Sequence, residues 1–162
     1  MDASEIVRAA LVEAAKTLDP LSLIEDDVES DGDMARTEGA ASWAFAFEGD
    51  DVIVVDHAPA ERRVYFTAVI GAPPKERRLA VYELLLQYNA HWSETGGVRL
   101  AGEGAGGPIL QIYDMQADGL TAGDVAAAVS GLLAKLPEWR ALIERKDDAE
   151  APDAMPGAGL RV

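Results

Sequence analysis

The sequence predicts an α+β fold, in which three helices surround a twisted antiparallel sheet of about five strands in the order α-β-β-β-α-β-β-α. Apolar residues recur at helical spacing in three stretches, and bulky residues alternate with small or polar ones between them, as in strands. Links between successive strands are short, which favours antiparallel pairing. With 49% hydrophobic residues in 162, we expect one domain over residues 1–146. Residues 147–162, rich in Ala, Asp, Pro and Gly, are predicted to form a disordered tail.

The first helix is predicted over residues 3–18. Val7 and Leu11 lie on its apolar stripe, and charged residues occupy the other positions. Asp19-Pro20 ends this helix, because a residue before proline is pushed out of the helical region. The acidic stretch of residues 25–40 has few large apolar groups, and it is predicted to be a long exposed loop or a poorly paired edge.

Three strands follow. Trp43, Phe45 and Phe47 alternate with smaller or polar residues, which is the two-residue period of a strand with one bulky face. A Gly-Asp-Asp turn leads into a strand over residues 52–55, and a Pro-Ala-Glu turn leads into another over residues 63–70. Such short links predict three consecutive antiparallel strands.

The second half of the chain is predicted to form two helices with two strands between them. A helix over residues 75–92 has apolar residues on more than one stripe, so we expect it to need a second partner, most economically another copy of the chain. Strands are predicted over residues 98–100 and 109–115. Thr121, followed three residues later by an acid, has the form of a capping box and opens the last helix. Pro137 predicts a kink or a restart in that helix.

Charge and composition limit the possible partners. The net charge is -15, and residues 19–56 hold twelve acids against one base. Such a field repels nucleic acid and would attract basic or unfolded partners, although the acids also serve simply to keep the domain soluble. The absence of cysteine, of a secretory pattern and of any run near ~20 apolar residues predicts a cytoplasmic protein that does not insert into membranes.

Residues with catalytic or metal-binding potential are sparse. His57 and His91 lack further ligands at metal-site spacing, and both are interpreted as partly exposed structural histidines. Ser93 lies near His91 and Glu94, but neighbours in sequence rarely face each other as a triad. The glycines of residues 102–108 precede a strand rather than a helix, so a hairpin turn is favoured over a phosphate loop. We therefore expect no catalytic residues, no metal site and no cofactor, and we disfavour an enzyme.

The stretch YNAHWSETGG, residues 88–97, is interpreted as a joint between a helix and a strand. The apolar period stops within it, and Gly96-Gly97 can adopt the positive φ angles that close a helix and redirect the chain. Trp92 is predicted to anchor the end of the helix in the core.

At this joint the chain resembles a known family. The segments ERRLAVYELLLQYNAHWSETGGVRLA, ILQIYDMQADGL and TAGDVAAAVSGLLAKLPEWRALIE resemble the Tir chaperone family, the class I chaperones of type III secretion. The resemblance covers roughly residues 3 to 145 and rests on the order of the elements together with these loose motifs. The long acidic loop, Pro137 and the tail depart from the family pattern.

The resemblance implies a homodimer formed by the middle helix and a neighbouring strand. It also implies a non-catalytic chaperone that, without ATP, holds the N-terminal region of a secreted effector in extended form along hydrophobic grooves of the first helix and the sheet. A physical mechanism for such holding is addition of the extended segment to a sheet edge through main-chain hydrogen bonds, with its apolar side chains in pockets. The residues mapped to the dimer interface are Leu79, Tyr82, Leu85, Leu86 and Ile112. Those mapped to client binding are Val7, Leu11, Trp43, Phe45, Phe47 and Val54. The alternative is a sensory or stress-related protein-binding module of similar fold, without a role in secretion.

Overall fold

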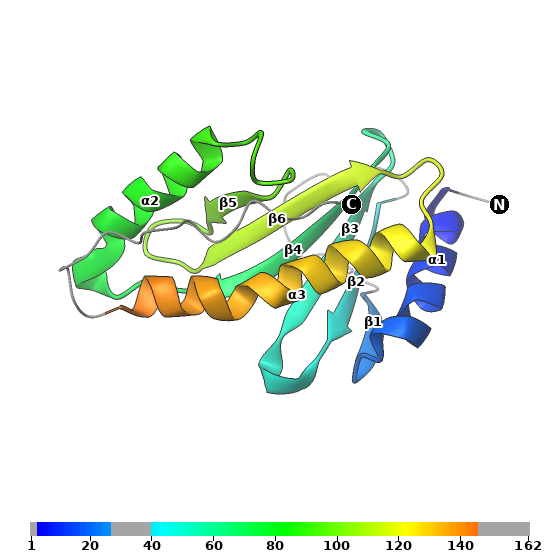
Figure 1. The fold of residues 1–162 in the computed structure, drawn as a ribbon. Helices are drawn as coiled ribbons and strands as arrows, with labels where there is room; N and C mark the ends of the chain where they lie inside the picture. The colour runs from blue at the N-terminus through cyan, green and yellow to red at the C-terminus, as the bar shows by residue number, and fades with distance from the viewer. Residues whose placement is uncertain (1–2, 27–39, 146–162) are drawn as a thin grey trace.

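The structure, a computed structural model, describes residues 3–26 and 40–145 (Figure 1). Its elements are α1 (Ala3–Leu18), β1 (Ser22–Asp26), β2 (Ala41–Ala46), η1 (Glu48–Asp50), β3 (Val52–Ala58), β4 (Arg63–Gly71), η2 (Lys75–Arg77), α2 (Arg78–Ala90), β5 (Arg99–Gly102), β6 (Ile109–Gln116) and α3 (Ala122–Glu144). The predicted tail, and the part of the predicted acidic loop between residues 27 and 39, lie outside the described residues.

The strands form one antiparallel sheet in the order β1-β2-β3-β4-β6-β5. The α+β class is confirmed, but the sheet has six strands where the sequence predicted about five. The additional strand is β1, whose last two residues, Glu25 and Asp26, were assigned to the exposed loop. A five-residue strand that ends in two acids has no strong pattern of its own, and its pairing with β2 supplies the order.

The core lies between the sheet and the helices α1 and α3. Side chains on one face of the central strands are almost completely buried, among them Phe45, Ile53, Val55 and Phe66. In Figure 1, α3 crosses this face and α1 packs near the start of α3. Gln111 of β6 also points to this face, where its amide donates a hydrogen bond of 2.8 Å to the carbonyl of Leu132 in α3.

The opposite face of the sheet is not covered by α1 or α3. The strand register aligns a row of side chains across it, from β1 to β6: Ile24, Ala44, Val54, Thr67 and Ile112. None of these five side chains is fully buried, and Ile24 is 55% exposed. The sheet is thus a half-buried layer with one open face.

Helix α3 begins as predicted. The Thr121 hydroxyl accepts a hydrogen bond from the Asp124 amide, and the Asp124 carboxylate accepts one from the Thr121 amide, which completes the capping box. The predicted restart at Pro137 is wrong, because one helix of 23 residues runs through it. Proline removes one hydrogen bond within the helix, and the buried side chains of Leu136 and Trp139 beside it keep the helix on the sheet.

Helix α2 is attached to α3 at both ends. Near its end, the Tyr88 ring meets Trp139 edge to face at a centroid distance of 5.0 Å. Before its start, the Arg77 guanidinium donates hydrogen bonds to the carbonyls of Leu142 and Arg145 at the end of α3. The predicted helix over residues 75–92 is shorter in the structure, since its first three residues form the 3-10 turn η2.

The joint after α2 is confirmed. Helix α2 ends at Ala90, a turn follows, and Gly96 and Gly97 have φ angles of 65° and 89°. The Thr95 hydroxyl donates a hydrogen bond to the carbonyl of Trp92 and holds the turn. The prediction for Trp92 itself is wrong: its side chain is 76% exposed, because the helix ends two residues earlier and the turn directs the indole outward.

Two of the three tryptophans, Trp139 in the core and Trp92 on the surface, provide a matched test of this arrangement. We expect Trp139→Ala to destabilise the protein by about 3–5 kcal/mol, because it empties a buried site, and Trp92→Ala to change the stability by less than about 0.5 kcal/mol. Urea denaturation followed by circular dichroism at one protein concentration measures both. Equal losses in the two variants would contradict the placement of these side chains.

Candidate binding site

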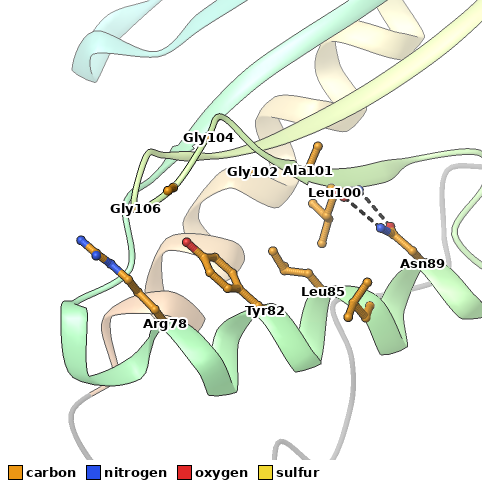
Figure 2. A pocket seen from close by; sticks show the side chains of 11 residues that line it. Arg78, Tyr82, Leu85, Asn89, Leu100, Ala101, Gly102, Gly104 and Gly106 are labelled. Atoms are coloured by element: carbon orange, nitrogen blue, oxygen red, sulfur yellow. Dashed lines mark hydrogen bonds between the residues drawn. The ribbon is translucent and has the colours of Figure 1, made fainter.

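A pocket of about 620 Å³ lies between α2 and the sheet edge formed by β5 (Figure 2). Arg78, Tyr82, Leu85 and Asn89 project into it from one side of α2, at intervals of three and four residues. Leu100 and Ala101 of β5, together with the glycine turn that follows, form the opposite wall. The lining is mostly apolar.

Asn89 fixes α2 against the edge of the sheet. Its side-chain amide donates a hydrogen bond of 2.9 Å to the carbonyl of Leu100 and accepts one of 3.0 Å from the Leu100 amide. The side chain thus occupies the place that a neighbouring strand would take on an edge strand. At this point the β5 edge is closed to strand addition.

Arg78 is the one charged residue among the eleven that line the pocket. Its guanidinium lies against Gly106, where a β-carbon would come within 2.8 Å of Nη1. Its Nε is buried and has no hydrogen-bond partner among residues 3–26 and 40–145. The pocket therefore combines apolar walls with a cation at the end nearest the start of α2.

The glycine turn beside the pocket is the hairpin turn predicted from the sequence. The Glu103 amide donates a hydrogen bond of 2.9 Å to the carbonyl of Pro108, and the Gly107 amide donates one of 3.3 Å to Gly104. Gly104 and Gly106 have positive φ angles of 79° and 75°, which a residue with a β-carbon rarely adopts. The turn brings the backbone close to Arg78.

The side of α2 that faces away from the core is an exposed apolar stripe. Leu79 and Leu86, two turns apart, are 73% and 70% exposed. Of the residues mapped to a dimer interface, Leu79 and Leu86 lie on the stripe. Tyr82, Leu85 and Leu86 line the pocket, so Leu86 belongs to both, and Leu85 is only 6% exposed. Ile112 is separate from them, since it belongs to the row of side chains on the open sheet face.

The residues mapped to client binding do not share one surface. Four of them, Val7, Leu11, Trp43 and Phe45, are at most 2% exposed and belong to the core. Phe47 is half-buried and stacks on Phe45 at a centroid distance of 6.3 Å. Val54 lies on the open face of the sheet.

Exposed apolar side chains do occur beside these core residues. Leu21 and Ile24 are 69% and 55% exposed at the edge strand β1, and Val12 of α1 is 43% exposed. The Arg8–Glu25 ion pair of 2.9 Å ties α1 to β1, and Val12 lies one turn from Arg8 on the same side of the helix. Sequence reasoning missed this surface. The available signal was the apolar run Leu-Ser-Leu-Ile directly after Asp19-Pro20.

The two histidines take no part in the pocket. His57 is 2% exposed, with Nδ1 3.0 Å from the hydroxyl of Ser4 in α1, so the prediction of a partly exposed histidine is wrong for it. His91, Ser93 and Glu94 lie on the surface of the joint. Among the described residues, no group of three or more His, Asp or Glu side chains could hold a metal ion.

The groups with shifted pKa values also lie outside the pocket. The hydrogen bond from Thr121 lowers the pKa of Asp124, and burial raises the pKa of Tyr88. The hydrogen bond to Glu61 raises the pKa of Tyr65. Each shift has a cause in capping, packing or a surface contact. In the ranges that the structure covers, no helix is both long and apolar enough to cross a membrane.

Comparison with known proteins adds a family and a fold. The sequence model of the Tir chaperone protein (CesT) family matches residues 37–140. A search of curated proteins found no match.

Solved structures similar to this one include the following three. A chain of the ExsC-ExsE complex is 17% identical with a TM-score of 0.70, and the match covers 91% of this chain and 100% of that chain. A chain of the HopA1-SchA chaperone-effector complex is 16% identical with a TM-score of 0.62, and the match covers 86% of this chain and 98% of that chain. A chain of the Yersinia pestis type III secretion chaperone SycH in complex with a stable fragment of YscM2 is 14% identical with a TM-score of 0.57, and the match covers 81% of this chain and 97% of that chain. At such identities the likeness establishes a shared fold.

The role of Asn89 at the sheet edge can be measured directly. We expect Asn89→Ala to cost about 1–3 kcal/mol of stability, because it leaves the amide and carbonyl of Leu100 without their partner. Hydrogen exchange should become faster at the Leu100 amide. Gln87→Ala, which removes an exposed amide from the same helix, is the control and should leave that exchange rate unchanged. Unchanged exchange in Asn89→Ala would mean that the edge is held by other contacts.

Proposed function

The chain belongs to the Tir chaperone protein (CesT) family, and on this basis we propose that it is a non-catalytic type III secretion chaperone. It binds the N-terminal region of a secreted effector in an extended form and keeps that region competent for export. The observation that carries the proposal is the family match, which extends from the residues before β2 into α3. The likeness to two chains from complexes described as chaperone-effector and type III secretion chaperone supports it.

The client segment binds at β1. This strand forms one edge of the sheet, and an extended segment can add to such an edge through main-chain hydrogen bonds. Side chains of the added strand alternate between two faces. On the open face they meet Ile24, and on the other face they meet the side of α1 that carries Val12.

The residues first mapped to client binding divide between two roles in this arrangement. Val54 lies in the same row as Ile24, with Ala44 between them, so it extends the apolar surface offered on the open face. The hydrophobic core between β2 and α1 includes Val7, Leu11, Trp43 and Phe45. These core residues hold β2 and α1 in place, and the exposed residues beside them contact the client segment.

A homodimer forms through α2. Leu79 and Leu86 present two large apolar side chains to solvent over two turns of helix, which favours an interface with a partner. A second copy supplies the same stripe, and a two-fold axis can bring the two stripes together. The chaperone acts in the cytoplasm, where holding a client requires neither a reaction nor a cofactor.

Substitution at β1 tests the client surface. The tagged protein is recovered from its native host, the associated protein is identified, and binding of that protein's N-terminal fragment is measured by calorimetry. We expect Ile24→Asp to weaken binding by about 10-fold or more, because it removes about 1.5–3 kcal/mol of apolar burial at the contact. Val69→Asp, a change at a 48% exposed residue of β4, is the control.

A folded partner that binds without its N-terminal region would overturn the chaperone proposal and favour the protein-binding module. Equal weakening by the two Asp variants would remove the client surface from β1.

Substitution on the stripe tests the homodimer. We expect Leu79→Asp to weaken the dimer by roughly 150-fold, since an unpaired charge buried at an interface costs about 3 kcal/mol or more. Light scattering after size exclusion should give a monomer mass for this variant and a dimer mass for the control Ile6→Asp, a substitution at an exposed position of α1. Leu85 is unsuitable, because its burial within one protomer would confuse pairing with folding. A dimer mass for Leu79→Asp would refute the α2 interface.

A further inference from the structure

The pocket between α2 and β5 has no role in the client surface at β1, and it shares Leu86 with the exposed stripe of α2. We propose that residues 146–162 of the same chain occupy this pocket in the monomer, with their carboxylates at Arg78 and their apolar side chains against Tyr82, Leu85 and Leu100. The proposal goes beyond the proposed chaperone function, because it concerns how the chain covers its own α2.

The segment starts directly after α3, close to the pocket. The Arg77 guanidinium donates hydrogen bonds to the carbonyls of Leu142 and Arg145, so the last described residue is held beside the start of α2. The next residue along α2, Arg78, lines the pocket. Residue 146 therefore begins next to the cationic end of the pocket.

The segment is long enough to extend along the whole pocket. Its 17 residues span up to about 56–61 Å when extended, whereas the 13 residues of α2 extend over about 20 Å. A segment joined to the same chain also has a high effective concentration at a site this close to its attachment. A second copy of the chain has no such advantage at low protein concentration.

The charges of the two partners are complementary. The segment carries four acids and two bases, and the acids are concentrated in its first half: Asp147, Asp148, Glu150 and Asp153. The region from η2 to the start of α2 has Lys75, Arg77 and Arg78 against one acid, Glu76, and the start of a helix also favours negative charge. In a chain of net charge -15, this is a local basic surface for an acidic segment.

The second half of the segment suits the walls of the pocket. It contains the apolar residues Met155, Leu160 and Val162 together with small residues, a proline and Arg161, so apolar side chains can enter while the chain remains extended. Tyr82, Leu85 and Leu100 offer apolar surface to them. A carboxylate at Arg78 would also form a strong charge-assisted hydrogen bond, because the guanidinium lies at the edge of an apolar pocket.

Occupation by the segment has a consequence for pairing. Leu86 belongs both to the pocket and to the stripe, so the segment and a second copy compete for part of α2.

The test uses the full chain, which contains no cysteine and so accepts a single label. A nitroxide spin label at Ala158→Cys should abolish the amide signals of Gly104 and Gly106 in the ¹⁵N spectrum and leave those of Thr67, on the open sheet face, intact. The measurement is made on the monomer, which is either the protein itself or its Leu79→Asp variant. Leu79 does not line the pocket, so the result is independent of whether the homodimer exists.

Three variants and one control test whether charge holds the segment in the pocket. Arg78→Glu should restore the Gly104 and Gly106 signals, and adding Asp147→Lys and Asp148→Lys to it should abolish them again. Lys135→Glu, on α3, is the control and should change nothing. Neutralising the segment alone, with Asp147→Asn, Asp148→Asn, Glu150→Gln and Asp153→Asn, should restore the signals without touching the folded residues, which keeps the test valid if Arg78→Glu does not fold.

The remaining outcomes would overturn the proposal. Intact Gly104 and Gly106 signals in the labelled protein would show that the segment does not occupy the pocket. Signal loss only when spin-labelled chains without ¹⁵N are mixed with unlabelled ¹⁵N chains would assign the segment to a neighbouring molecule.

Discussion

The structure depends on a sheet that buries only one of its two faces. Along β2, β3 and β4 every second side chain points to α1 and α3 and loses nearly all its contact with water. The side chains between them, except that of Ser42, remain half-buried or exposed. Burial of apolar area is the main favourable term in folding, so the covered face holds the domain together. The open face is covered by neither α1 nor α3, and it presents half-buried and exposed side chains. Helices α1 and α3 lie on the covered face, where they bury its apolar side chains.

A one-layer sheet also has two edges, and here they differ. At one edge the side chain of Asn89 takes up both backbone groups of Leu100, and α2 lies alongside β5. At the other edge β1 is joined to the rest of the protein by its pairing with β2 and by the ion pair from Arg8 to Glu25. An edge strand with free backbone groups is a site for strand addition. Among the described residues, the β5 edge is thus covered by α2, whereas β1 pairs with a strand on one side only.

Much of this fold could be predicted from the sequence because its signals are local. Residues 3–18 show helical periodicity, Gly96-Gly97 marks a turn, and Thr121 forms its cap with a residue only three positions away. The missed strand β1 has no such signal, since its order comes from a partner strand fifteen or more residues further along the chain. Long-range pairing of this kind cannot be recognised by reading one short stretch.

The candidate site was less predictable than the fold, for a physical reason. Periodicity identifies which side of a helix or strand is apolar, but an apolar side may be covered by its own chain or remain available to a partner. Phe45 and Ile24 look alike in the sequence, yet the first is in the core and the second is on the surface. On α2 the same ambiguity separates Leu85 from Leu86, which are adjacent in sequence and differ from 6% to 70% in exposure. Only the packing of distant elements resolves it.

Exposed apolar side chains favour association between molecules, and the charge of the chain opposes it. Leu21 and Ile24 at β1 and Leu79 and Leu86 on α2 would each favour association with any apolar surface. A net charge of -15 opposes such contacts between copies at long range, because like charges repel before apolar surfaces meet. A partner must therefore either bring complementary charge or match the shape of the surface closely enough to overcome the repulsion. The acidity thus opposes non-specific association of the exposed apolar side chains.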